Sequence, residues 1–210
     1  KQFILISTGT WSIALNPFVK RTLSRKDVAD DCINYMRING KPVKSARLFL
    51  GNEYSIQVKK LTEHYGVDKD YHKSVRFDPE THYKLVNGFQ KMFHWESIHD
   101  PDMPPKTHLP YLSFEQAYHQ LMMELVLLQV ASIKSAKGKM TIEKLFVDGG
   151  FSDNDIYIHL LSHHFRNMEL RTTDSSLGSA LGAAICISDT QLNSKFLKKN
   201  YSMKKHIPFF

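Results

Sequence analysis

The order of apolar patterns along the chain constrains its fold more than any other feature of the sequence. Two short apolar runs, 3–7 and 11–15, flank a glycine-containing turn, which is typical of a β-hairpin. After this hairpin, predicted strands and helices are mixed along the chain, and they alternate strictly from residue 145 onward. The later predicted elements are a strand over 28–39, a helix over 53–65, a helix over 113–137, a strand over 145–147, a helix over 153–165, a strand over 168–171 and a small-residue helix over 176–188. This alternation predicts an α/β fold in which helices flank a mixed sheet.

Capping residues support several of these helices. Ser113 and Gln116 have the spacing of a capping box, and Ser152 is predicted to cap the helix that begins at 153. Residues 66–112 are polar and rich in proline, but they contain Trp95 and many other aromatic residues. We therefore expect an ordered excursion there and not a linker.

Composition excludes several classes of protein. The 210 residues suit one domain, and no apolar run approaches the ~20 residues of a membrane span or the pattern of a secretory signal. The two cysteines, Cys32 and Cys186, are too far apart in sequence for a metal knuckle, so we expect buried thiols in a reducing compartment, the cytoplasm. The net charge of +7 is spread out and does not form a dense stripe, which favours a small anionic ligand over nucleic acid.

The start of the sequence indicates a piece of a longer protein. Residue 1 is Lys and not Met, and an apolar strand begins at Phe3 without any lead-in. Natural domains seldom begin inside a buried strand, so we expect residues 1–210 to be one domain of a longer chain.

The first candidate binding loop is the turn of the hairpin, Ser7-Thr8-Gly9-Thr10-Trp11-Ser12. Glycine allows the backbone to approach a ligand, successive N–H groups can surround an anion, and the hydroxyl groups add donors. Such a turn suits a phosphate group. Taken alone, it is better explained as a polar hairpin turn.

The second candidate loop is Asp148-Gly149-Gly150-Phe151-Ser152-Asp153-Asn154, between a strand and a helix. Paired glycines at this position let the backbone pass close to a nucleotide. Neither a GxGxxG nor a GxxxxGKS fingerprint is present, and the GxSxG elbow of hydrolases fails because its last position is Asn154. An ordinary strand–helix turn also explains this loop when it is considered alone.

Together, the motifs resemble the FGGY carbohydrate kinases. Residues 7–12 resemble the phosphate hairpin of the second domain, 145–154 resemble the adenosine motif, and 179–184 resemble the small-residue helix that follows it. The order is that of the family, and the resemblance covers the whole chain as a C-terminal domain. It implies an actin-like ATPase (ribonuclease H-like) fold. Two departures are Leu177, where the family often has Glu, and residues 66–112, which do not match.

The resemblance also implies roles for particular residues. Thr8, Gly9 and Thr10 would contact the terminal phosphates of ATP or ADP, while Gly149, Gly150 and Asn154 would line the adenosine site. Mg²⁺ would accompany the nucleotide, and Asp148 is a lesser candidate for contact with metal-bound water. The family's catalytic Asp and most of its sugar pocket precede the first strand, so we expect the fragment alone to be inactive.

The parent protein would then transfer the γ-phosphoryl group of ATP to a sugar hydroxyl, with the N-terminal domain and the sugar as its partners and oligomerisation left open. The alternative is a non-catalytic actin-like module that binds nucleotide or docks a partner.

Eleven histidines also raise the question of a metal site. His159 and His163 are four residues apart, but they lack the Glu of HExxH, so we interpret them as surface residues of an amphipathic helix.

Overall fold

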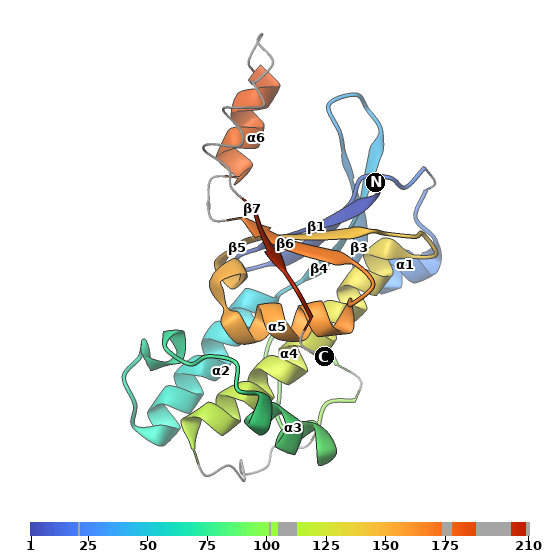
Figure 1. The fold of residues 1–210 in the computed structure, drawn as a ribbon. Helices are drawn as coiled ribbons and strands as arrows, with labels where there is room; N and C mark the ends of the chain where they lie inside the picture. Colours follow the sequence, from blue (N-terminus) through green and yellow to red (C-terminus); the bar gives the residue numbers. More distant parts are fainter. Residues whose placement is uncertain (21, 101, 105–112, 174–177, 188–202, 209–210) are drawn as a thin grey trace.

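The computed structural model describes residues 1–20, 22–100, 102–104, 113–173, 178–187 and 203–208. These residues form a mixed seven-stranded sheet in the order β3-β4-β2-β1-β5-β6-β7, and Figure 1 shows most of the helices against one face of it. The strands are β1 (Phe3–Thr8), β2 (Ser12–Asn16), β3 (Cys32–Met36), β4 (Pro42–Leu48), β5 (Lys144–Gly149), β6 (Glu169–Thr173) and β7 (Met203–His206).

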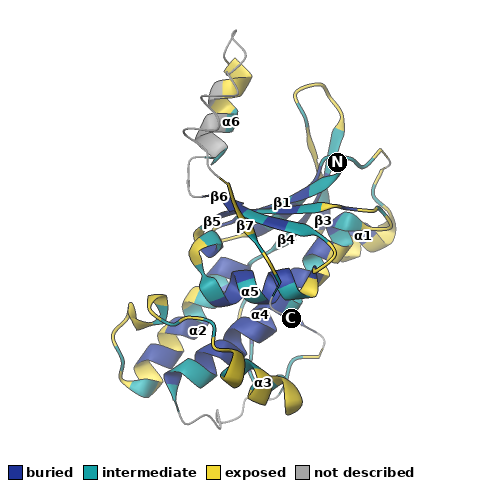
Figure 2. Cartoon of the chain, viewed as in Figure 1, coloured by how far each residue is buried: buried dark blue, intermediate teal, exposed yellow. Residues whose placement is uncertain are grey.

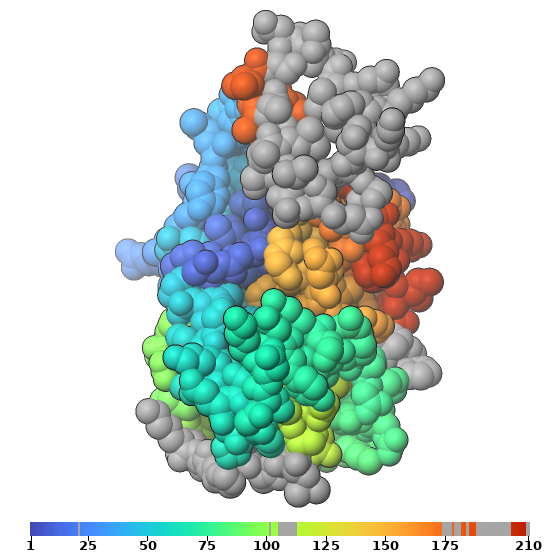
Figure 3. Space-filling model, turned by 90° about the vertical axis from the view of Figure 1, so that its left-hand side faces the viewer, coloured from blue at the N-terminus to red at the C-terminus, as the bar shows by residue number. Residues whose placement is uncertain are grey.

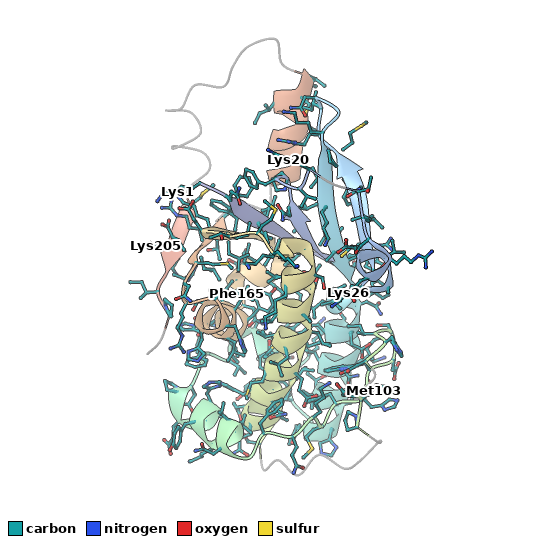
Figure 4. All side chains as sticks on the ribbon, turned by 90° about the vertical axis from the view of Figure 1, so that its right-hand side faces the viewer. Lys1, Lys20, Lys26, Met103, Phe165 and Lys205 are labelled. Atoms are coloured by element: carbon teal, nitrogen blue, oxygen red, sulfur yellow. The ribbon has the colours of Figure 1, made fainter. Side chains whose placement is uncertain are left out.

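The α-helices are α1 (Arg25–Ala29), α2 (Leu50–Tyr65), α3 (Pro79–Asn87), α4 (Phe114–Lys137), α5 (Asp155–His164) and α6 (Gly178–Ile187), and two short 3₁₀ turns are η1 (Tyr71–Lys73) and η2 (Gly150–Asp153). Helix α4 is the longest described helix and contacts α2, α3, α5 and several strands. Figure 4 shows α4 from one side, with Phe165 at the end of α5 on one flank and Lys26 of α1 and Met103 on the other.

Strand β1 lies near the middle of the sheet because it pairs on both sides. It is antiparallel to β2 and parallel to β5, with Leu5 opposite Leu15 and Thr8 opposite Gly149. Side chains of a strand alternate between two faces. Ile4 and Ile6 are fully buried, whereas Leu5 is only partly buried, so the helix-covered face is the interior of the protein (Figure 2).

The excursion predicted over 66–112 is ordered in its described part, as expected. Two buried carboxylates of the helices hold it. Glu53 accepts hydrogen bonds from the backbone N–H groups of Glu96 and Ser97, and Glu124 accepts them from Met92 and Phe93. Trp95, in the same segment, is only 3% exposed.

Several local predictions were wrong. The strand expected over 28–39 is shorter, because helix α1 occupies its first residues, and its partner β4 was not predicted as a strand. Asn154, and not Ser152, caps the helix after the second glycine loop. Strand β7, which contains Lys204 and Lys205, was not predicted, and Cys186 is exposed instead of buried.

Helix α6 confirms the helix predicted over 176–188 in its described part, and Figure 1 shows it standing apart from the helical layer. Leu177 and the ends of that prediction lie outside the described residues. No helix in the described ranges combines the length and apolar character needed to cross a membrane.

Candidate functional site

Parallel pairing of β1 and β5 brings the two glycine loops together. Thr8, the last residue of β1, pairs with Gly149, the last residue of β5. The first loop leaves β1 and the second leaves β5 at the same carboxyl edge of the sheet. Ligands of open α/β sheets bind at such an edge. The loops are about 140 residues apart in sequence but adjacent in space.

Thr8 joins the loops through its side chain. Its hydroxyl donates to the carbonyl oxygen of Asp148 at 2.6 Å and accepts from the N–H of Phe151 at 3.1 Å. Thr8 is 5% exposed. The hydroxyl of Thr8 therefore holds the two loops together. Because this side chain is buried and already hydrogen-bonded, the contact with phosphate expected for Thr8 stays a prediction.

Two glycines permit close backbone contact on either side of the first loop. Gly149 has φ +90°, and a Cβ there would lie 1.9 Å from the carbonyl oxygen of Thr8. A Cβ on Gly51 would lie 1.9 Å from the carbonyl oxygen of Gly9. The N–H of Asn52 also donates to the carbonyl oxygen of Thr10 at 3.1 Å. The start of α2 and the end of β5 thus fix the first loop between them.

A cavity of about 240 Å³ opens where these segments meet. It is lined by Gly9, Thr10, Gly51, Tyr54, Ser55, Gly150, Phe151 and Asn154. Figure 3 views the face on which the N-terminal strand region, α2 and the segment around residue 150 adjoin. Four of the six predicted binding residues line this cavity, and the other two, Thr8 and Gly149, join the strands beside it.

The α2 side of the cavity was not found from the sequence. Gly51, Tyr54 and Ser55 were not proposed as site residues, and Gly51 was not even placed in the helix, which was predicted to begin only at Glu53. A glycine inside the first turn of a helix was the available signal, since glycine weakens a helix unless close packing requires it.

Asn154 is held rigidly at the cavity wall. Its side-chain oxygen accepts from the N–H of Tyr157 at 2.9 Å, which caps α5, and its side-chain nitrogen donates to the hydroxyl of Tyr118 at 2.8 Å. The Tyr118 hydroxyl lies 2.8 Å from that of Tyr54. Burial raises the pKa of both tyrosines, so their hydroxyls stay protonated at neutral pH.

We expect opposite stability effects from removing two buried hydroxyls near the site. Tyr118→Phe should lower the free energy of unfolding by about 1–3 kcal/mol, because it leaves the side-chain N–H of Asn154 without its hydrogen-bond acceptor. Tyr157→Phe should be neutral or stabilising by about 1 kcal/mol, because no described residue hydrogen-bonds its buried hydroxyl. Urea unfolding of both variants measures this difference. An equal loss in the two variants would contradict it.

Asp148, the lesser candidate for contact with metal-bound water, is 8% exposed, and its carboxylate accepts from the hydroxyl of Thr173 at 2.7 Å. Among the described residues, no group of three or more His, Cys, Asp or Glu side chains is arranged to hold a metal ion. Mg²⁺ commonly needs only one or two carboxylates together with substrate phosphates. The contact between Asp148 and metal-bound water therefore stays a prediction.

Comparison with known proteins finds a family match over the first 78 residues. Residues 1–78 match the family described as carbohydrate kinase FGGY, C-terminal domain. The resemblance seen in the sequence is thereby confirmed. No curated protein sequence matches the chain.

Solved structures share the fold over nearly the whole chain. A carbohydrate kinase from Novosphingobium aromaticivorans is 18% identical, with a TM-score of 0.66 over 99% of this chain and 43% of that one. A ligand-bound xylulose kinase from Lactobacillus acidophilus is 10% identical, with a TM-score of 0.61 over the same shares. A Plasmodium falciparum glycerol kinase with ADP is 16% identical, with a TM-score of 0.55 over 87% of this chain and 37% of that one.

These matches confirm the predicted fold class. The chain has the mixed sheet and flanking helices of an FGGY kinase C-terminal domain, which is an actin-like ATPase fold. It spans less than half the length of the kinases that it matches. At these sequence identities, the similarity to the solved structures shows a shared fold and does not show a shared activity.

Proposed function

We propose that this chain is the nucleotide-binding domain of an ATP-dependent sugar kinase. The observation that carries the proposal is the meeting of the two glycine loops around one cavity, which follows from the parallel pairing of Thr8 with Gly149. The non-catalytic alternative is not favoured, because the structural neighbours are sugar kinases.

The cavity has features that suit a nucleotide. A Cβ built on Gly150 meets no atom within 4 Å, so this glycine leaves open space against the ligand. Gly9 and Thr10 present a turn suited to phosphate, while the rings of Tyr54 and Phe151, 5.0 Å apart, provide an aromatic wall for a base.

The cavity is smaller than a complete binding site. Its volume of about 240 Å³ lies below the ~300–1,000 Å³ of usual small-molecule pockets. A second, open hollow of about 810 Å³ is lined by Trp11, which directly follows Thr10, and by Phe49, whose ring lies 4.4 Å from that of Trp11. We infer that a phosphoryl acceptor approaches from this side, and that an N-terminal domain completes both sites.

The residues of this chain would position the nucleotide, and they would not supply a general base. Bound ATP would supply the γ-phosphoryl group, and Mg²⁺ would neutralise its charge. The turn at Gly9 and Thr10 would orient the terminal phosphates, while Gly150 and Asn154 would fix the nucleoside. Phosphoryl transfer depends mainly on such positioning. The chain alone should therefore show no sugar-stimulated ATP turnover.

A pair of tryptophan variants tests the nucleotide site. Gly150→Trp fills the cavity, whereas Gly88→Trp places the same side chain at another glycine with open space around it, outside the cavity. We expect Mg·ADP to bind the wild type and Gly88→Trp, and binding to fall at least tenfold in Gly150→Trp. Isothermal titration calorimetry measures this, with circular dichroism confirming that both variants fold.

Equal binding by both variants would contradict the proposed site. No heat from the wild type up to millimolar Mg·ADP would contradict nucleotide binding by this chain alone. The same titration on a gene product that includes an N-terminal domain would then test whether that domain completes the site.

A further inference from the structure

Asn154, Tyr118 and Tyr54 form a chain of side-chain hydrogen bonds, and its last member, Tyr54, is a residue that lines the cavity. The amide of Asn154 has a fixed orientation, because its oxygen accepts from the N–H of Tyr157. Its nitrogen must therefore donate to the Tyr118 hydroxyl oxygen. The first bond of the chain thus has a known direction.

The direction of the second bond follows from burial. Tyr118 is 1% exposed, so leaving its hydroxyl hydrogen without an acceptor would be costly. The hydroxyl oxygen of Tyr54, 2.8 Å away, is the acceptor available among the described residues. Tyr118 therefore donates and Tyr54 accepts, which leaves the hydrogen of Tyr54 free to donate elsewhere.

Tyr54 lines the cavity beside Phe151 of the second glycine loop. Gly51 packs against Gly9, and Tyr54 follows Gly51 by three residues, which is ~4.5 Å farther along the axis of α2. The ring of Tyr54 contacts Phe151 and the cavity wall there also includes Asn154. A ligand whose phosphates lie at Gly9 would place its base beside this aromatic wall.

We propose that the Tyr54 hydroxyl donates a hydrogen bond to an acceptor nitrogen of the purine base, and so helps to select the nucleotide. This inference rests on the proposed function, because it assigns one contact within the same site. The raised pKa of Tyr54 keeps the hydroxyl a donor throughout the neutral range. Asn154 and Tyr118 act as positioning residues, since they orient Tyr54 without that contact.

The test combines two variants with nucleotide analogues. Tyr54→Phe and Tyr118→Phe each remove one hydroxyl of the same hydrogen-bonded pair, but only Tyr54 lines the cavity. ADP and its 1-deaza, 3-deaza and 7-deaza analogues, each of which lacks one base nitrogen, are titrated into the wild type and both variants. Thermal unfolding shows which fraction of each variant is folded.

We expect Tyr54→Phe to bind ADP about three- to tenfold more weakly than the wild type does. One deaza analogue should bind the wild type more weakly by a similar factor and should bind Tyr54→Phe with no further loss. Tyr118→Phe should still discriminate between ADP and that analogue, because it retains the donor at the cavity.

The outcomes separate this inference from the proposed function. If ADP binds at a site blocked by Gly150→Trp, yet every analogue loses the same factor on Tyr54→Phe, the base contact is overturned and the nucleotide site stands. An unchanged affinity of Tyr54→Phe for ADP also overturns it. If the wild type binds no ADP, both the inference and nucleotide binding by this chain are overturned.

Discussion

Gly149→Ala should destabilise the protein more than any other single methyl addition near the site. The new Cβ would lie 1.9 Å from the carbonyl oxygen of Thr8, in a backbone conformation with φ +90° and ψ −165° that is nearly confined to glycine. The backbone strain costs about 1–3 kcal/mol and the overlap about as much again. We expect a loss of about 3–5 kcal/mol in the free energy of unfolding, measured by urea denaturation.

Gly138→Ala is the matched control for this prediction. Gly138 also has positive φ, at +56°, with ψ −136°, but a Cβ there meets no atom within 4 Å. This variant should show the backbone cost without the overlap. Equal losses in the two variants would mean that the contact between β1 and β5 at Gly149 is not as close as the structure has it.

The consequence for binding follows from the same contact. Because Gly149 pairs with Thr8, separating them moves the two glycine loops apart. Gly149→Ala should therefore weaken Mg·ADP binding even under conditions where the variant is folded. Gly138, at the end of α4, does not line the cavity, so its variant should bind as the wild type does.

Local sequence signals predicted the strands and helices around the site because their apolar periodicity and turn residues are strong. Ser113 caps α4 as predicted, and the turn at 148–150 follows a buried strand. The pairing of β1 with β5 did not follow from any local pattern. It was available only through the resemblance to a family in which both loops serve one nucleotide.

The predictions failed where long-range contacts override local patterns. Strand β7 carries Lys204 and Lys205, which are typical of a solvated segment, but the backbone pairs with β6 at the edge of the sheet. Charged residues are common on such edges. The start of α2 was missed because glycine is unfavourable within a helix. The close contact of Gly51 with Gly9 explains why a glycine occupies this position.

Glu124 should make the stability of the protein fall as the pH rises from about 4.5 to about 7. Burial raises the pKa of this glutamate from 4.5 to about 7, and the hydrogen bonds from Gln120, Met92 and Phe93 offset only part of that effect. The folded state therefore binds a proton that the unfolded state has already released within this range. Stability is highest below the unfolded pKa and is lost as the pH rises through the folded one.

The Glu124→Gln variant isolates this effect, because glutamine does not ionise. The buried His119 and the partly buried His82 have lowered pKa values and produce the opposite trend below about pH 6.5, but they do so in both proteins. The difference in unfolding free energy between the variant and the wild type should therefore shift by about 3 kcal/mol in favour of the variant between pH 4.5 and pH 7. Urea unfolding at a series of pH values measures it. If the unfolding free energies of the two proteins change in parallel with pH, Glu124 has an ordinary pKa. Its hydrogen bonds to the excursion would then offset the whole effect of burial on the carboxylate.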